Sequence, residues 1–320
     1  IRMKNIRIIG VGHKPAETCV TNDMLSEIVD TNDEWITTRT GIKTRYFSEN
    51  KNTSELGYEA ALNAIKDAGI DKTEIVATMT PDNAMPSTAC LIQEMLGLND
   101  QKIMAFDMNA ACNGFISALQ VGSSLLGRFK TVLVVGAETN SKILDFADRS
   151  TCILFGDGAG AAVLSYEECE KETFMYSNSM GDNKNVLTCK NNGLTPLMTS
   201  NRAVNNYMTM QGNDVFRFAI RVMEEAIVEV LKESNLTIDD IDCIIPHQAN
   251  IRIIKHVARS MNLPMEKVFV NLDKYGNTSS ASIGIALSEA KAQGVIKEND
   301  KVILVGFGGG FTYSSYLYQF

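Results

Sequence analysis

The chain has 320 residues and a formal net charge of −8, and 45% of its residues are hydrophobic while 21% are charged. This composition is typical of a globular protein, and a chain of this length buries about three quarters of its unfolded surface without disulfides or metals. A nucleic-acid-binding protein normally shows a basic balance or a basic run, and this chain has neither. No apolar run approaches the roughly 18 residues that a membrane-spanning helix needs.

The seven cysteines are an odd number, and none belongs to a Cys-x-x-Cys pair or stands near a histidine at metal-ligand spacing. A secreted disulfide framework is denser and usually even-numbered. The first residues, Ile1–Asn5, contain no apolar signal segment. We therefore expect reduced thiols, a cytoplasmic protein and no bound metal.

Short β-rich runs alternate with helical patterns along the chain, which favours an α/β fold with largely parallel sheets. In chain order, the pattern predicts a strand at Ile6–Ile9, helices at Ser54–Ala68 and Thr88–Leu96, a strand at Ile103–Asp107, a helix at Gly114–Leu126, strands at Thr131–Val135 and Ala161–Ser165, a helix at Val215–Ser234, a strand at Ile241–Ile245, a helix at Asn250–Met261, a strand at Val268–Asn271, a helix at Ser280–Gln293, and strands at Val302–Val305 and Ser314–Tyr318.

The order of these elements repeats once. The run Thr-Val-Leu-Val-Val-Gly at Thr131 resembles Lys-Val-Ile-Leu-Val-Gly at Lys301, and in each half a strand leads through a small-residue turn into an apolar helix. We therefore expect two halves, 1–170 and 171–320. The first half has a shorter strand near Thr73–Ala77 than its counterpart Ile238–Ile245, through truncation or through missing residues.

Cys112 is the first candidate for chemistry. It ends the run Asp-Met-Asn-Ala-Ala-Cys, in front of the apolar helix Gly114–Leu126. The positive end of a helix dipole favours the thiolate, which is the nucleophilic form of cysteine. The alternative is a small buried side chain without a chemical role, and the other six cysteines show no catalytic signal.

His247 and Asn277 are the next candidates. His247 follows a strand, and the carboxyl ends of parallel strands are where sites are built. Asn277 lies in a Gly-Asn-Thr turn that occupies, in the second half, the place of the Cys112 turn, so it can approach Cys112 across a pseudo-twofold axis. Without the repeat, an ordinary turn would be the preferred interpretation. We interpret His13 and His256 as structural.

The run Gly-Phe-Gly-Gly-Gly at Gly306 follows a strand but lacks the spacing of a dinucleotide-binding loop. Consecutive glycines let backbone N–H groups approach a substrate, which suits an oxyanion hole.

These motifs occur in one order, and together they closely resemble β-ketoacyl-acyl carrier protein synthase III of the thiolase superfamily, over essentially the whole chain. The resemblance also covers Asp33–Ile42, Pro86–Ala89 and Phe155–Ala161. It implies a thiolase-like fold: two duplicated halves in five layers, α-β-α-β-α, with the cysteine in the first half and the histidine and asparagine in the second.

The resemblance implies that Cys112 is acylated by an acyl-CoA, either acetyl-CoA or another short primer. Malonyl-acyl carrier protein then loses carbon dioxide and condenses with the acyl group. His247 and Asn277 are implied as neutral donors to the enolate, and the N–H groups of Cys112 and Gly309 as the oxyanion hole. No resident cofactor is implied, because the CoA thioester is a substrate.

Two positions indicate the type that initiates fatty-acid synthesis. Chain-elongating relatives use a second histidine where this chain has Asn277, and plant-type polyketide synthases typically have proline at the position of Gly309.

The binding residues also follow from the resemblance. Trp35 is expected to stack on the CoA adenine, with Arg149 on the other face and Arg39 near the phosphates. Met85 is expected to cross the interface of a homodimer and to influence acyl-chain length, and as a methionine it leaves the primer open. The pantetheine arm and the pocket mouth are assigned to Asn213, Asn250 and Phe307.

The acyl carrier protein is acidic, and this chain is acidic too, so a local basic patch must overcome the repulsion. Arg252, Lys255 and Arg259 share one helix face. The full set assigned to the carrier protein is Arg217, Gln248, Arg252, Lys255 and Arg259.

Three alternatives stay open. One is a same-fold acyltransferase or condensing enzyme of secondary metabolism, which the arginines disfavour because they suit a carrier protein. Another is a catalytically dead thiolase-fold scaffold, which the complete Cys-His-Asn set argues against. The last is a cysteine hydrolase in which Asn277 orients His247, and it leaves the glycine run unexplained.

Overall fold

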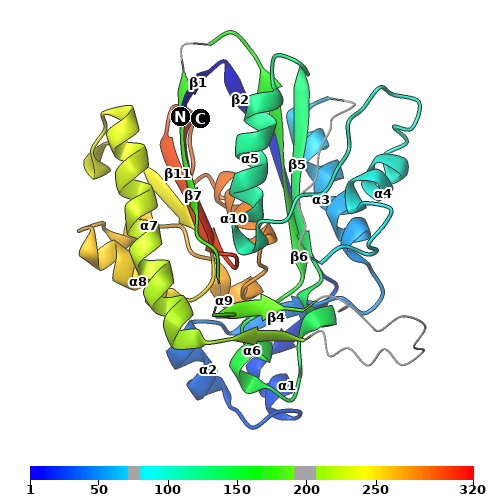
Figure 1. The fold of residues 1–320 in the computed structure, drawn as a ribbon, viewed down its shortest axis with the longest axis vertical. Helices are drawn as coiled ribbons and strands as arrows, with labels where there is room; N and C mark the ends of the chain where they lie inside the picture. Colours follow the sequence, from blue (N-terminus) through cyan, green and yellow to red (C-terminus); the bar gives the residue numbers. More distant parts are fainter. Residues whose placement is uncertain (71–79, 170, 183, 191–206) are drawn as a thin grey trace.

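The structure is a computed structural model that describes residues 1–70, 80–169, 171–182, 184–190 and 207–320. Its elements stack in five layers, with helices outside, a sheet on each side and two helices in the middle (Figure 1). The thiolase-like arrangement expected from the sequence is therefore confirmed.

The sheet of the first half has three strands in the order β2-β6-β5, and both pairings are antiparallel. Two helices cover its outer face, on the right in Figure 1. The elements of this half are β2 (Ile6–Pro15), α3 (Thr53–Ala68), α4 (Thr88–Met95), β5 (Thr131–Glu138) and β6 (Gly158–Tyr166).

The second sheet has five strands in the order β1-β7-β12-β11-β10, four from the second half and β1 from the start of the chain. Helices α7 and α8 cover its outer face, on the left in Figure 1. The elements are β1 (Arg2–Lys4), β7 (Glu172–Ser179), α7 (Gly212–Ser234), β10 (Cys243–Pro246), α8 (Ile251–Ser260), β11 (Lys301–Gly308) and β12 (Thr312–Gln319).

The middle layer consists of α5 (Gly114–Leu125) and α10 (Ala281–Ala292), which lie between the two sheets. Both helices are apolar on nearly every side, as a helix with a sheet on each face must be. A Cβ on Gly284 would lie 2.9 Å from the carbonyl carbon of Gly160, so glycine is required where α10 crosses β6. Two of the residues predicted to be catalytic, Cys112 and Asn277, lie just before the amino ends of these two helices.

Short elements gather at one end of the molecule, at the bottom of Figure 1. The antiparallel strands β3 and β4 pair there, and the chain between them forms two helices, of which α2 carries the predicted CoA-binding residues Trp35 and Arg39. These elements are β3 (Thr18–Thr21), α1 (Asn22–Ser26), α2 (Asp33–Thr40), β4 (Thr44–Phe47), α6 (Arg149–Cys152), β8 (Leu187–Cys189), β9 (Met208–Met210) and α9 (Leu272–Tyr275). No helix in the described ranges has the length and apolarity needed to cross a membrane.

The six predicted helices are all present, but the prediction of largely parallel sheets is wrong. Among the described strands, only β10 and β11 form a parallel ladder. The last strand of each half, β6 or β12, inserts antiparallel between two strands that run the same way. A tight reversal after Gly308 leads directly into β12, whereas the connection from β5 to β6 is longer and contains the short helix α6.

Two predicted strands are also corrected. The segment Ile103–Asp107 is not a strand in the structure, and Val268–Asn271 makes only a single bridge, from Val268 to Ile244. A strand needs a paired neighbour, and the neighbour that the duplication assigns to Ile103–Asp107 is the segment near Thr73–Ala77, which lies outside the described residues.

Candidate active site

Cys112 lies in a single turn of 3-10 helix, Ala111–Asn113, directly before α5. The turn begins with Ala111 at a φ of 48°, and the side chain of Asn109 accepts its N–H across 2.9 Å. The end of β11 presses against this turn, since a Cβ on Gly308 would lie 2.8 Å from the nitrogen of Cys112. The predicted place of Cys112 at a helix start is therefore confirmed. Position 308 must be glycine, because any larger residue would collide with the main chain at Cys112.

His247 directly follows β10 and donates its N–H to the carbonyl of Val305 on β11 (2.8 Å). Its ring is buried, with Nδ1 lying 2.6 Å from Oγ of Ser282, and Phe307 packs edge-on against it at 5.3 Å. Nε2 has no hydrogen-bond partner among the described residues. A buried nitrogen without a partner is rare unless it serves a ligand.

Asn277 is fixed at both its main chain and its side chain. It forms an isolated parallel bridge with Phe155, through hydrogen bonds to the neighbouring main chain. Its side-chain oxygen accepts the N–H of Ser279 (2.9 Å). The amide NH₂ is therefore the end that remains for a ligand.

The three candidates meet around the turn 277–282 that precedes and opens α10. Asn277 belongs to it, Ser282 contacts His247, and the hydroxyl of Ser279 interacts with the side chain of Cys112. The hydroxyl of Ser279 nevertheless makes no hydrogen bond of ordinary geometry. The sequence missed both serines, because nothing in the local pattern shows which catalytic side chain each one faces.

Burial controls the ionisation of the two titratable candidates. It raises the pKa of Cys112 to about 12, opposed by Ser279 and reinforced by the charge of Glu138. The expected shift of Cys112 toward thiolate is therefore wrong for the free protein, because the thiol is buried where the charged form is poorly solvated. Burial also lowers the pKa of His247 to about 3, so its imidazole is neutral at pH 7. The prediction of a neutral His247 is confirmed.

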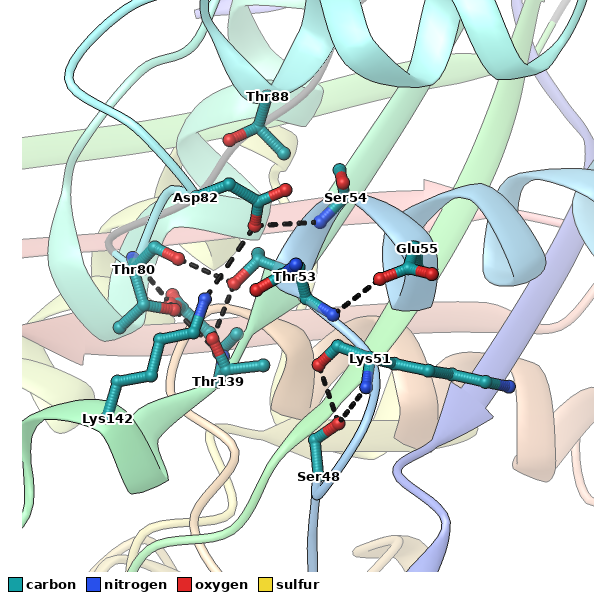
Figure 2. Close-up of polar contacts among 12 residues, drawn as sticks. Ser48, Lys51, Thr53, Ser54, Glu55, Thr80, Asp82, Thr88, Thr139 and Lys142 are labelled. Carbon is teal, nitrogen blue, oxygen red and sulfur yellow. Dashed lines mark hydrogen bonds and ion pairs between the residues drawn. The ribbon is translucent and has the colours of Figure 1, made fainter.

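Glu138 is a buried carboxylate that sequence reasoning missed. One oxygen accepts the hydroxyl of Ser280 (2.6 Å), and the other accepts the N–H and the hydroxyl of Thr80 (3.0 and 2.6 Å). Figure 2 shows the adjoining bonds: the hydroxyl of Thr53 lies 2.6 Å from both the carbonyl oxygen of Thr80 and the hydroxyl of Thr139, and the hydroxyl of Thr80 accepts the N–H of Thr139 (2.8 Å). This network ties the cleft wall to the start of α10. An acidic residue ending an apolar strand, as Glu138 does, was the available signal.

A cleft of about 680 Å³ opens beside Cys112. Gly309 and Phe155 line it, as do Asp82 and Lys142, whose side chains form an ion pair at 3.7 Å (Figure 2). The described residues contain no group of histidine, cysteine and carboxylate side chains arranged to hold a metal ion. The cleft can thus bring a substrate carbonyl to Cys112 and to the end of β11.

Trp35 is half-buried on α2, and both predicted arginines lie against its ring. The guanidinium of Arg39 is 4.4 Å from the ring centre, and that of Arg149 is 5.0 Å away. Helix α2 begins where Asn32 accepts the N–H of Trp35 (2.8 Å). An aromatic face bordered by two cations suits a flat, electron-rich, anionic ligand.

Three of the remaining predicted substrate contacts lie on the outer rim, and one lies deeper. Asn250 caps α8 and donates its amide to the carbonyl of Arg39 (3.1 Å), which links α8 to the Trp35 helix. Asn213 is exposed at the start of α7. Phe307 is buried beside His247 and therefore lies deeper than the mouth of the pocket. Met85 is 84% exposed, just beyond the cleft residues Thr80–Ala84.

The predicted basic face of α8 is present: Arg252, Lys255 and Arg259 are all exposed on it. Arg217 lies on α7, paired with Asp214 (2.6 Å). The assignment of Gln248 to carrier-protein binding is wrong. Its side chain is 1% exposed, and main-chain groups of Pro246, Phe269 and Asn271 hold its amide, so no partner protein can reach it.

Comparison with known proteins places the chain in a family. A family model described as 3-oxoacyl-[acyl-carrier-protein (ACP)] synthase III matches residues 106–183, and the model of its C-terminal part matches residues 231–320. The beta-ketoacyl-[acyl-carrier-protein] synthase III of Clostridium perfringens (strain ATCC 13124) is 47% identical over 98% of this chain and 99% of that protein. The protein of the same name from Clostridium acetobutylicum is 46% identical, covering 98% of each.

A solved structure agrees with these matches. The crystal structure of 3-oxoacyl-[acyl-carrier-protein] synthase III from Aquifex aeolicus VF5 has a TM-score of 0.91 and 41% identity, over 98% of this chain and all of that one. Relatives at this identity cover nearly the whole chain, and the cysteine, histidine and asparagine lie around the turn 277–282. The chain therefore belongs to the 3-oxoacyl-[acyl-carrier-protein] synthase III family of condensing enzymes.

Proposed function

We propose that this chain is a β-ketoacyl-acyl carrier protein synthase III in which Cys112, His247 and Asn277 are the catalytic residues. It takes an acyl group from a short acyl-CoA onto Cys112 and condenses it with malonyl-acyl carrier protein, which starts fatty-acid synthesis. The observation that carries the proposal is the meeting of all three residues around the turn 277–282, with Nε2 of His247 buried and unpartnered.

In the first half-reaction, the sulfur of Cys112 attacks the carbonyl carbon of the acyl-CoA thioester. The new carbon–sulfur bond replaces the bond to CoA, and the thiol proton ends on the departing CoA sulfur. Cys112 stays protonated until the substrate arrives, because burial holds its pKa at about 12. The N–H groups of Cys112 and Gly309 stabilise the oxyanion, supported by the close approach of the end of β11 to the Cys112 turn.

In the second half-reaction, the malonyl group loses carbon dioxide and its bonding electrons pass into a thioester enolate. His247 and the amide of Asn277 donate hydrogen bonds to the enolate oxygen. The enolate carbon then attacks the acyl carbonyl on Cys112, the carbon–sulfur bond breaks, and the sulfur takes up a proton. Neutral donors suffice because the charge is transient and the site is buried, as is His247 at 1% exposure.

Substrate binding uses the rim on α2 and α8. Trp35 stacks on the adenine of CoA beside Arg149, with Arg39 near the phosphates, while Asn213 and Asn250 contact the pantetheine arm. Phe307 packs against His247 at the inner end of the site. The exposed arginines and lysine of α8 receive the acidic carrier protein. The hydrogen bond from Asn250 to Arg39 supports this arrangement, because it brings the two binding regions together. No resident cofactor is needed, since CoA arrives as part of the substrate.

We further propose a homodimer located in the cytoplasm. Met85 is 84% exposed beside residues that line the cleft, so a second subunit covering Met85 would also close the end of the primer site. None of the seven cysteines, all of which lie in the described ranges, forms a disulfide, which suits a reducing compartment.

Mass spectrometry of the intact protein tests the catalytic proposal. After incubation with acetyl-, butyryl- and isobutyryl-CoA in turn, we expect an acyl adduct on Cys112 that malonyl-acyl carrier protein discharges as a β-ketoacyl product. Cys112→Ala should form no adduct. Cys189→Ala is the matched control, because this second thiol lines the same cleft and its removal should leave acylation intact.

Three results would contradict the proposal. The first is the absence of an adduct with every acyl-CoA. The second is release of the acyl group as a free acid, which indicates a hydrolase. The third concerns His247→Ala and Asn277→Ala, which should acylate but fail to decarboxylate malonyl-acyl carrier protein, and retained decarboxylation in both would refute their assigned roles.

A further inference from the structure

Ser282 is the partner of His247 on the side of the ring that faces away from the substrate. It is the second residue of α10, and its Oγ lies 2.6 Å from Nδ1 of His247. The two side chains are 2% and 1% exposed. Water is therefore excluded, and the protein groups around the pair must determine which atom carries the hydrogen between them.

The hydrogen-bond partners of Ser282 settle that question. A serine hydroxyl has one hydrogen to donate and two lone pairs to accept. The N–H of Gln248 donates to Oγ of Ser282 (3.4 Å), which occupies a lone pair and leaves the hydrogen free. A serine in a helix often donates to the carbonyl four residues earlier, but Oγ of Ser282 makes no hydrogen bond to the carbonyl of Thr278: among the described residues its partners are His247 and Gln248.

Within the part of the chain that the structure describes, Nδ1 of His247 is the acceptor that remains for this hydrogen. If Nδ1 carried its own hydrogen, the hydroxyl hydrogen of Ser282 would be buried without a partner, which is unfavourable. With the hydroxyl donating to Nδ1, every hydrogen of the pair is bonded. The ring then carries its hydrogen on Nε2.

We propose that Ser282 is a positioning residue that holds His247 in the tautomer with hydrogen on Nε2, so that His247 acts as a donor to the malonyl thioester. Nε2 is buried and has no partner among the described residues, so its N–H is available to a substrate oxygen. The identity of that oxygen rests on the proposed function, but the tautomer is a property of the free protein. Ser282 should then support decarboxylation and matter little for acylation of Cys112.

Nitrogen NMR of the full-length protein, labelled with ¹⁵N, measures the tautomer directly. The chain has three histidines, so His13→Gln and His256→Gln variants complete the assignment. At pH 7 we expect a protonated Nε2 and a bare Nδ1 for His247. In Ser282→Ala a population with hydrogen on Nδ1 should appear, whereas Ser282→Thr, which keeps the hydroxyl, should resemble the unmodified chain.

The structure contains a matched control on the same helix. Oγ of Ser288 lies 2.9 Å from Nδ1 of His13, and neither residue lines the cleft beside Cys112. Ser288→Ala should change the signals of His13 and leave those of His247 unchanged. The His13 signals in turn report whether Ser282→Ala is folded. If that variant does not fold, Ser282→Cys, with its weaker donor, should give an intermediate tautomer population.

The two half-reactions supply the second readout. In Ser282→Ala, decarboxylation of malonyl-acyl carrier protein should fall roughly fivefold to tenfold, as expected for one net hydrogen bond, while acylation by acyl-CoA stays within about twofold. A His247 with hydrogen on Nδ1 in the unmodified chain overturns the proposal, as does an unchanged tautomer in Ser282→Ala. Absence of any acyl adduct would refute the proposed function but leave the tautomer result standing.

Discussion

Gly156 holds the main chain of Asn277: its N–H donates to the carbonyl of Asn277 across 3.0 Å. Asn277 in turn donates its N–H to the carbonyl of Leu154 (2.8 Å), and together these bonds form the isolated bridge between Asn277 and Phe155. Gly156 belongs to the half that carries Cys112, and Asn277 belongs to the half that carries His247. The bridge therefore fixes Asn277 directly against the half that carries Cys112.

Gly156→Ala should damage this bridge. The added Cβ would lie 2.5 Å from the carbonyl oxygen of Tyr275, a main-chain atom that cannot move without displacing Asn277. We expect a loss of about 1–3 kcal/mol in the free energy of unfolding, as for other overpacked sites. Decarboxylation of malonyl-acyl carrier protein should fall more than acylation of Cys112. Denaturant unfolding and the two half-reaction assays measure these effects.

Gly181→Ala is the matched control, because a Cβ there meets no described atom within 4 Å. It should change neither stability nor activity appreciably. Full activity and full stability in Gly156→Ala would show that the bridge does not determine the position of Asn277.

The sequence predicts the helices better than the sheets. Helices α5 and α10 were predicted because their uniform apolarity is a property of the segments themselves. The direction of β12 was not, because a strand pattern records which faces are buried and not which way the neighbours run. For the same reason the apolar segment Val268–Asn271 resembles a strand in sequence. In the structure it pairs with a neighbour at only one position, Val268.

The reacting groups were likewise easier to predict than their partners. Cys112 and Asn277 stand in short turns before apolar helices and His247 directly follows a strand, places where the local sequence is informative. The partners Glu138 and Ser282 are found through contacts to Ser280 and His247 that span 142 and 35 positions. A single sequence contains no signal for such pairs. Only the fold reveals that Ser282, and not another serine of this turn, reaches the imidazole.

The buried His247 should make stability depend on pH. Burial lowers its pKa to about 3 in the folded protein from an ordinary value of 6.5. Below pH 6.5 the unfolded chain binds a proton that the folded chain does not, so the free energy of unfolding falls as pH decreases toward 3. At one pH unit below 6.5, the loss from this residue is about 1.4 kcal/mol.

His247→Gln should remove this loss, since glutamine does not titrate. The difference in unfolding free energy between the unmodified chain and His247→Gln should be constant above pH 7 and should shift in favour of the variant below pH 6.5. Urea unfolding at a series of pH values measures it. His256→Gln is the control, because His256 is exposed on α8. A difference that does not vary with pH would contradict the buried neutral imidazole.

Trp35→Ala should weaken binding of acyl-CoA. Stacking of a base on an aromatic ring contributes about 1–3 kcal/mol, so we expect the KM for acyl-CoA in the acylation step to rise roughly tenfold with kcat little changed. Trp35→Phe keeps an aromatic face beside Arg39 and Arg149 and should recover most of the affinity. An acyl-pantetheine, which lacks adenine, is the substrate control. If Trp35→Ala weakens both substrates equally, the ring does not bind the adenine.

The basic face of α8 should govern the second substrate and not the first. Arg259 is exposed on this face, and opposite charges brought together raise the association rate with an acidic protein in a salt-dependent way. Arg259→Glu should therefore raise the KM for malonyl-acyl carrier protein severalfold at low salt, and the difference from the unmodified chain should shrink as salt is added. Lys297→Glu changes the net charge by the same amount at an exposed position after α10. Because the whole chain is acidic, this control separates a local docking surface from the global charge: equal effects in the two variants would mean that overall repulsion, and not α8, limits the encounter.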